Sequence, residues 1–482
     1  MSKHVCKKIF LLLITLLNVR VLHARTMLSR NDYYPLYTTM DPHAFLHTRT
    51  RDELHGRDWH ADEVEPERFS FYLTPFGQNA NIGKDFLCDC DEENGEWELG
   101  SLNAHWSMIG LLMGDIPDGN SYGDVLQLAR KTLFNNTSDL TATTSLDIPQ
   151  AIDCEKKFGF FQFPGCYKKR GLRMQLSAAI TDDFGVIIEG GASAINFTIT
   201  RNCENDLTSP ITSGSCLEKV ASESSGGLGH TGFTQDNVET YLMCKLTEIA
   251  KELNRDLCNF HKTSIEDIRV GFYWRRAFEV NEERVDWPRF LFIPFVALGV
   301  GAAAAKEADP LAPFALPHGN NGHNCFWIYG GNNIDFSETV EIGWELGFVH
   351  FFDSSFSKYP VPTSELQRGI FPFTSDVTIS PGANWHFSLK TQARHFLDRL
   401  SFYFQWVVME HKRDEILVRD CNKAFKPGIL ECRSPWKAQV INTALNYDIS
   451  PNIAIGFAWQ APISQRNVFR STTLAFGINF TF

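Results

Sequence analysis

The C-terminal half of the chain alternates between apolar residues and small or polar residues with a period of two. In the last segment Leu474, Phe476, Ile478, Phe480 and Phe482 share one face, and small or polar residues occupy the other. Successive side chains of a β-strand point to opposite faces, so this period predicts strands. The same alternation recurs over residues 340–348, 385–394 and 453–460. This half of the chain is therefore predicted to be all-β.

Alternation alone fits both a soluble β-sandwich and a membrane barrel. Two features favour the barrel. Tryptophans recur on the apolar face, at Trp344, Trp385, Trp406 and Trp459, as in the aromatic girdles of membrane proteins. The other face carries Gly, Ala, Asn and isolated charges, which suits an enclosed lumen better than a soluble surface. Lipid satisfies no backbone group, so such a sheet must close on itself.

The connections between the alternating segments are long and short in turn. Counted back from the C-terminus they cover about 461–471, 448–452, 412–435, 395–399, 351–382 and 331–335, followed by 302–323 and 278–289. Outer-membrane barrels have short periplasmic turns and long outer loops. Turn-forming residues mark two of the short connections, Asp448–Asn452 and Gly331–Asn333, and Thr181–Asp183 joins a further strand pair at 172–180 and 186–200.

The strand count is the weakest part of this prediction. With 68–76 and 101–112 included, thirteen candidate strands can be drawn, whereas bacterial single-chain barrels have even numbers. We therefore predict an antiparallel transmembrane β-barrel of about 12–14 strands. The apolar run from Phe290 to Ala305 is read as a strand and loop, with a transmembrane helix as the alternative, because the run is short and contains Pro294.

Two segments have helical periodicity. Apolar residues recur at helical spacing from Val238 to Phe260, which predicts an amphipathic helix in a long outer loop, and Gly123 to Phe134 is a second case. The first helix is expected either to cap the barrel rim or to fold inward as a plug. The turn-rich segment Gly319–Asn324, beside Cys325, is expected to shape an entrance or to hold residues of positive φ.

The N-terminus carries the features of a secretory signal. Lys3, Lys7 and Lys8 precede an apolar run that is too short for a comfortable transmembrane helix. We expect cleavage near Ala24, with an uncleaved anchor as the alternative. Removing residues 1–24 would move the formal net charge from −12 to −16. An acidic chain without basic clusters argues against nucleic-acid binding.

Three regions follow from these patterns: a signal peptide over 1–24, a polar N-terminal arm over 25–66, and a barrel over 67–482 that is best supported from 170 onward. The arm is expected to be extended, either in the periplasm or in the lumen. Its His43, His47, His55 and His60 are scattered, and no metal site is predicted there.

Eleven cysteines remain after cleavage, and in an exported protein they indicate disulfides with at least one cysteine left over. Pairs that flank single polar segments are expected to staple loops: Cys421 with Cys432, Cys203 with Cys216, and Cys154 with Cys166. Cys88-Asp89-Cys90 is either an acidic exposed loop or a metal site, and the loop is the preferred interpretation. Cys244 and Cys258 are about 21 Å apart along one continuous helix, so they cannot pair with each other.

With its signal segment, alternating strands and terminal aromatic strand, the chain resembles Gram-negative outer-membrane β-barrels of the porin-like class. In that class the terminal strand is the signal read by the barrel-assembly machinery. The resemblance implies this role for Phe476, Phe480 and Phe482, with outer-membrane lipid and the assembly machinery as partners. It also implies localisation in the bacterial outer membrane, and a homo-oligomer is possible in this class.

Charged residues on the predicted lumen face are the candidates for function. They are Glu341, Glu345, Lys390, His386, Glu189 and Arg173. Charges facing lipid would each cost several kcal/mol, so a lumen position is expected. Rings of such charges select permeating ions. The alternative is that these residues simply pair across a filled lumen.

No catalytic motif or cofactor-binding loop is present, so we predict neither an enzyme nor a cofactor. The leading hypothesis is a passive outer-membrane channel or transporter for small solutes. The alternatives are a structural or adhesive surface protein with a filled barrel anchor, and a fatty-acid-type transporter of hydrophobic solutes. The latter group carries an Asn-Pro-Ala motif near the mature N-terminus, which this chain lacks.

Overall fold

The computed structural model describes residues 69–86, 97–133 (without 102 and 108), 160–199 (without 164 and 182), 242, 245–280, 290–336, 340–397, 399–450 (without 421) and 452–481. The predicted signal peptide and N-terminal arm lie outside these residues. So do Phe482 and seven of the cysteines discussed above: Cys88, Cys90, Cys154, Cys203, Cys216, Cys244 and Cys421.

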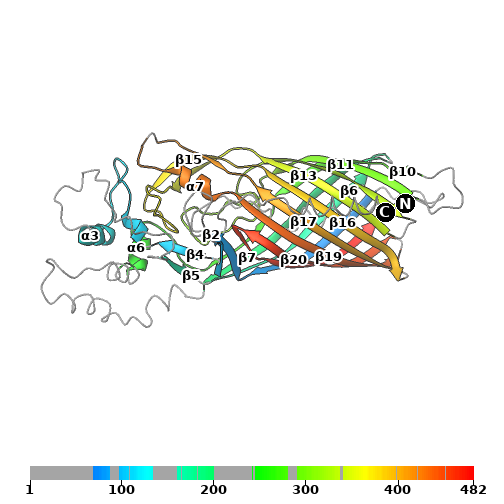
Figure 1. The fold of residues 1–482 in the computed structure, drawn as a ribbon, viewed down its shortest axis with the longest axis horizontal. Helices are drawn as coiled ribbons and strands as arrows, with labels where there is room; N and C mark the ends of the chain where they lie inside the picture. The colour runs from blue at the N-terminus through cyan, green and yellow to red at the C-terminus, as the bar shows by residue number, and fades with distance from the viewer. Residues whose placement is uncertain are drawn as a thin grey trace, which may run out of the picture.

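Twelve antiparallel strands form a closed barrel (Figure 1). They are β1 (Phe69–Ala80), β6 (Gly165–Ala179), β7 (Phe184–Ile199), β9 (Ile268–Arg275), β11 (Phe290–Ala302), β12 (Cys325–Phe336), β13 (Val340–Phe351), β16 (Asn384–Leu397), β17 (Leu400–His411), β19 (Trp436–Ser450), β20 (Ile453–Arg466) and β22 (Thr472–Thr481). The first strand pairs with the last, Phe71 opposite Phe480, and this seam closes the sheet. Two short strands, β8 (Phe260–Ile265) and β10 (Phe278–Glu279), extend the sheet beside β7 and β11.

The two faces of the barrel wall differ as the alternation predicts. Along β13, Ile342, Trp344 and Leu346 are exposed, while Glu341 and Glu345 at the alternate positions are buried. Leu474, Phe476 and Phe480 of β22 are likewise exposed and point outward. An apolar outer face and a polar inner face are what a membrane barrel needs, so the prediction of an antiparallel transmembrane β-barrel is confirmed.

The long and short connections separate to opposite ends of the barrel. In Figure 1 the C-terminus lies at the end away from α3 (Asp124–Leu133) and α6 (Leu246–Glu252), which sit in the long connections. The predicted connection at 181–183 is confirmed, since β6 ends at Ala179 and β7 begins at Phe184. Its geometry is fixed by the Phe184 amide, which donates to Thr181 Oγ1 at 3.1 Å.

Two predictions about strands are wrong. Gly331–Asn333 is not a turn, because β12 runs through it and Gly331 pairs with Glu345 of β13.

Residues 101–112 are not a barrel strand. Within them β4 (Asn103–Ser107) pairs with β5 (Phe160–Phe163) in a separate sheet. The segment Ile109–Leu112 then forms a 3-10 helix that buries both Leu111 and Leu112, which strand alternation does not allow. Removing this segment from the thirteen candidates leaves the twelve strands observed.

The strand interpretation of 290–305 is confirmed, because β11 covers Phe290–Ala302. No helix among the described residues is long and apolar enough to cross a membrane.

The long connections pack together into a cap at the outer mouth of the barrel. The cap includes α3, α6, α7 (Pro427–Arg433) and the small sheet of β14 (Ser354–Pro360), β15 (Thr374–Ser380) and β18 (Glu415–Val418). Its buried residues form one apolar core, which Phe197 near the outer end of β7 joins. The Phe197 ring stacks on Phe314 at a centroid distance of 5.9 Å. The cap is therefore packed onto the barrel wall.

The predicted helix at 238–260 is shorter than expected. It covers Leu246–Glu252 among the described residues, and β8 begins at Phe260. Asn254 has φ +53°, a left-handed conformation that ends helices. Leu257 continues the apolar spacing but is buried in the cap core from non-helical backbone. The second predicted helix, at 123–134, is confirmed as α3.

One predicted disulfide is wrong. Cys166 carries a free thiol, and it is held within the β6–β7 ladder opposite Thr198. Cys325 also carries a free thiol. Cys432 is disulfide-bonded, but Cys421 lies outside the described residues, so the pairing of these two stays a prediction, as does that of Cys203 with Cys216.

The cap core predicts a local effect of one substitution. Phe371 is fully buried in the cap, so Phe371→Ala should destabilise the cap by about 3–5 kcal/mol while leaving the barrel folded. Limited proteolysis should then cut the outer loops faster and still release an intact barrel core. Leu417→Ala, at a cap residue that is 67% exposed, is the matched control and should change little. Equal cleavage of the two variants would contradict a packed cap.

Candidate functional site

The inner face of the barrel carries two groups of buried polar side chains. We name them the wall cluster, formed mainly by β13 and β16, and the His318 cluster, formed by β6, β7, the β8–β9 junction and the loop after β11. All six lumen residues predicted from the sequence point inward and are largely buried. Four of them, Glu341, Glu345, His386 and Lys390, belong to the wall cluster, and Arg173 belongs to the His318 cluster. Glu189 lies in register with Arg269 of β9.

Two acid–base pairs cross from β13 to β16 in the wall cluster. Arg394 Nη2 donates to Glu341 Oε2 at 2.5 Å, and His386 Nε2 lies 2.9 Å from Glu345 Oε1. Neither base is directly opposite its acid, because the ladder sets Glu341 opposite Gln392 and Glu345 opposite Ser388. Both contacts are diagonal, two residues along the facing strand. They place the charges next to an opposite charge on the inner wall.

A glycine leaves room for the His386 ring. Gly347 faces His386 in the ladder, and a Cβ at this position would lie 2.1 Å from His386 Cε1. The His386 ring, as it reaches Glu345, therefore occupies the space that a side chain at position 347 would fill. Four residues further along β16, the Lys390 ammonium lies 4.8 Å from the centre of the Phe295 ring on β11, a cation–π distance.

The polar wall continues beyond the ion pairs. Gln405 Nε2 donates to Ser388 Oγ at 3.0 Å, and Asn442 Nδ2 donates to Gln405 Oε1 at 3.0 Å. These three residues come from β16, β17 and β19. The hydrogen-bonded chain makes this part of the inner wall a continuous polar surface.

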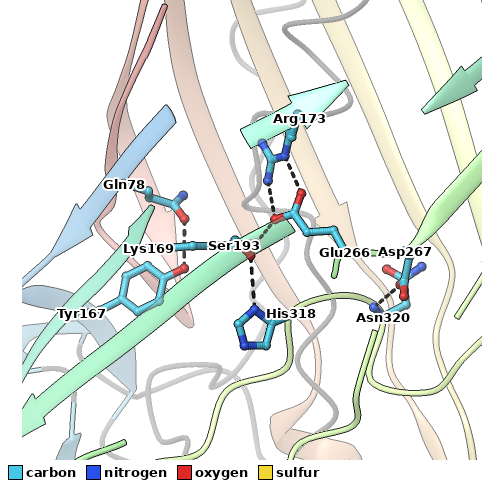
Figure 2. Close-up of polar contacts among 9 residues, drawn as sticks. All are labelled: Gln78, Tyr167, Lys169, Arg173, Ser193, Glu266, Asp267, His318 and Asn320. Atoms are coloured by element: carbon cyan, nitrogen blue, oxygen red, sulfur yellow. Dashed lines mark hydrogen bonds and ion pairs between the residues drawn. The ribbon is translucent and has the colours of Figure 1, made fainter. Parts of the chain in front are cut away.

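The His318 cluster is built around one carboxylate (Figure 2). Glu266 receives Lys169 Nζ at 2.7 Å and Arg173 Nε at 2.7 Å. The Arg173 guanidinium also lies 4.0 Å from the centre of the Phe76 ring. All three charged residues are buried, so two cations from β6 share one anion on the inner wall.

A β-bulge supplies Glu266 and its neighbour Asp267. Between the pairs Ala192–Ile265 and Glu189–Arg269, the β8–β9 strand has one residue more than β7. A bulge of this kind redirects side chains, and here both consecutive carboxylates are buried. The sequence pattern, which assumes strict alternation, cannot show this.

Asp267 holds the loop of residues 303–324 against the wall. Its carboxylate accepts the Asn320 amide at 2.5 Å and the Ala305 amide at 3.0 Å. Gly319 is required beside it, because a Cβ there would lie 2.3 Å from the Asp267 carboxylate. The expectation of positive φ in this loop is confirmed at Asn321 and Gly322.

His318 of the same loop contacts the wall. Its Nδ1 lies 3.2 Å from Ser193 Oγ of β7 (Figure 2). Burial and, to a smaller extent, the nearby Lys169 ammonium together lower the pKa of His318 to about 4. The imidazole is therefore neutral near pH 7, and the loop lies against the wall without adding a charge to it.

Sequence reasoning found the charges on regular strands and missed those that depend on tertiary contacts. Lys169 lies on the same face as Arg173, so its inward position was readable from the alternation. Ser193 was missed because β7 contains several small residues, and the alternation does not distinguish one of them from another. His318 precedes the turn-rich segment, but only the folded loop places it beside Ser193. The role of the six predicted residues in ion selectivity stays a prediction.

The low pKa of His318 predicts a pH-dependent stability. The unfolded chain binds a proton at this residue below about pH 6.5, whereas the folded protein does so only near pH 4. Folded stability should therefore be complete above about pH 6.5 and fall as the pH drops toward 4. Thermal unfolding at pH 7.5 and pH 4.5 should show a larger drop in Tm for the wild type than for His318→Gln. Parallel drops would contradict this role of His318.

No protein-family profile matches the chain, and no curated protein matches its sequence. Solved structures with a similar arrangement include an outer membrane channel from Pseudomonas putida F1, with 7% identity and a TM-score of 0.40, covering 88% of this chain and 100% of that chain. The CymD monoaromatic hydrocarbon channel has 8% identity and a TM-score of 0.29, covering 96% and 98%. The toluene transporter TodX from Pseudomonas putida has 8% identity and a TM-score of 0.25, covering 87% and 89%. On its own strand pairing and apolar outer face, the chain has the fold of a closed, twelve-strand antiparallel membrane β-barrel.

Proposed function

We propose that the protein is a passive outer-membrane channel for small hydrophilic solutes. The observation that supports this most strongly is the polar inner wall, where buried charges occur on β6, β7, β13 and β16. A lipid-embedded anchor needs an apolar outer face but no charged inner one. A twelve-strand barrel tilted by about 40° has about 24 Å between backbones on opposite walls, which is wider than side chains alone need.

The distribution of charge supports selection among ions. Asp335, Glu341 and Glu345 are buried acids on two neighbouring strands, β12 and β13. Lys169 and Arg173 are on β6, which β7, β9 and β11 separate from β12 in the barrel order. Each group lies beside a charge of opposite sign, Arg394 for the acids and Glu266 for the cations. The field of such closely spaced charges on a lumen wall acts on permeating ions.

The cap favours one alternative, a filled barrel that anchors a surface structure. Its apolar core joins the outer part of β7 and covers the mouth with packed side chains, and the lumen acids of β13 are paired. The fatty-acid-type alternative has less support, because the described inner wall is polar. In the channel proposal, solutes enter when the cap segments separate.

Single-channel recording in planar bilayers distinguishes the channel from the anchor. The full-length folded protein should produce discrete conductance steps. The baseline should be quiet when the same detergent is added without protein. A barrel that inserts, as judged by protection of its core from protease, yet gives no steps would overturn the channel and favour the anchor.

Neutralising both paired acids of the wall cluster should change ion preference. Glu341→Gln with Glu345→Gln removes two negative charges and leaves Arg394 positive, so the reversal potential in a salt gradient should shift away from cations. The matched control is Glu365→Gln with Glu415→Gln, which removes two exposed charges from the outer loops. An unchanged reversal potential in the wall variant would rule out a role of these acids in selectivity.

A further inference from the structure

A row of polar side chains crosses four strands on the outside of the barrel near its outer end. The ladders place Asn79 of β1 opposite Lys168 of β6, Lys168 opposite Asn196 of β7, and Asn196 opposite His261 of β8. All four residues are exposed. They alternate with buried, inward-facing residues, so they lie on the face that β6 and its neighbours turn to the membrane.

The next row toward the membrane centre adds a second cation. Arg170 lies opposite Gly77 of β1 and Ala194 of β7, and Ala194 lies opposite Thr263 of β8. Arg170 is exposed. A Cβ at Gly77 would have no heavy atom within 4 Å, so the surface beside Arg170 is open. We name the outward side chains of these two rows the outer basic patch.

The row below the patch is apolar. Leu172 of β6 and Ile265 of β8 are both exposed large apolar residues, at 38% and 53%. They continue into Met174 and Leu176, which are also exposed. Each step along a strand advances about 3.3 Å. The patch therefore lies where lipid headgroups meet acyl chains.

The two cations of the patch have no acidic neighbour among the residues that the structure describes. Among the described residues, no ion pair or hydrogen bond engages the side chain of Lys168 or Arg170, and the residues opposite them in the ladders are Asn, Gly and Ala. Lys168 and Arg170 are two residues apart on one face, so their Cα atoms are about 6.6 Å apart. Two like charges this close, beside hydrocarbon, repel each other unless an anion lies between them.

We propose that the outer basic patch binds the phosphate group of an anionic lipid in the outer leaflet. Arg170 and Lys168 would pair with the phosphate. Asn79, Asn196 and Thr263 would donate to neighbouring headgroup oxygens, and the acyl chains would lie on Leu172, Met174 and Ile265. This lipid site is on the outside of the barrel, so it is independent of solute passage.

The test is lipid binding to the full-length protein in neutral detergent, measured by native mass spectrometry. The probes are bisphosphorylated lipid A, the same lipid with its phosphates removed, and inorganic phosphate. The wild type should retain the phosphorylated lipid, and Lys168→Gln with Arg170→Gln should weaken that binding about tenfold or more, since each cation near a lipid surface contributes about 1 kcal/mol. The dephosphorylated lipid should bind both proteins equally weakly.

A matched double variant controls for overall charge. Lys358→Gln with Lys423→Gln removes two exposed cations from the outer loops and should leave lipid binding unchanged. Circular dichroism should show the same β-content for all three proteins, so that loss of binding is not loss of fold. The proposal is overturned if the patch variant retains the phosphorylated lipid as the wild type does, or if the control variant loses it equally. Binding of inorganic phosphate as tight as that of the lipid would also overturn it, because the site would then not be a lipid site.

Discussion

The structure depends on one constraint: a sheet surrounded by lipid must pair every strand on both sides. Water is absent from the hydrocarbon region, so an unpaired edge would leave a row of backbone groups unsatisfied. The antiparallel pairing of β1 with β22 removes that edge. Closure also fixes the register of every strand, and the register decides which side chains face lipid and which face the lumen.

The charged inner wall follows from that register. Each inward charge is taken out of bulk water, so it needs a partner on a neighbouring strand or loop. In the wall cluster the partners are diagonal across one ladder, and in the His318 cluster two cations of β6 meet a carboxylate provided by a bulge. The same bulge supplies Asp267, which fixes the loop of residues 303–324. One irregular point in the sheet thus positions both a charge cluster and a loop.

The regular part of this architecture could be predicted from the sequence, and the irregular part could not. Period-two alternation identified β13, β16, β20 and β22 and the inward position of Glu341 and Glu345, because strand geometry is local. It misplaced a turn at Gly331–Asn333, where turn-forming residues lie inside a strand that its neighbours hold extended. The alternation also assigned 101–112 to the barrel, and the helical spacing predicted a helix longer than α6. Both errors arise because these apolar residues are buried in the cap by segments that are distant in the sequence. Cys166 shows the same limit, since spacing along the chain does not reveal which thiols meet.

The closed barrel is tested most directly by electrophoresis of the folded protein before and after boiling, with reductant present so that disulfides do not contribute. Closed membrane barrels resist unfolding by detergent at room temperature, so the unboiled protein should migrate as a compact species and the boiled protein at the position of the unfolded chain. Identical migration of the two samples would contradict the closed twelve-strand barrel.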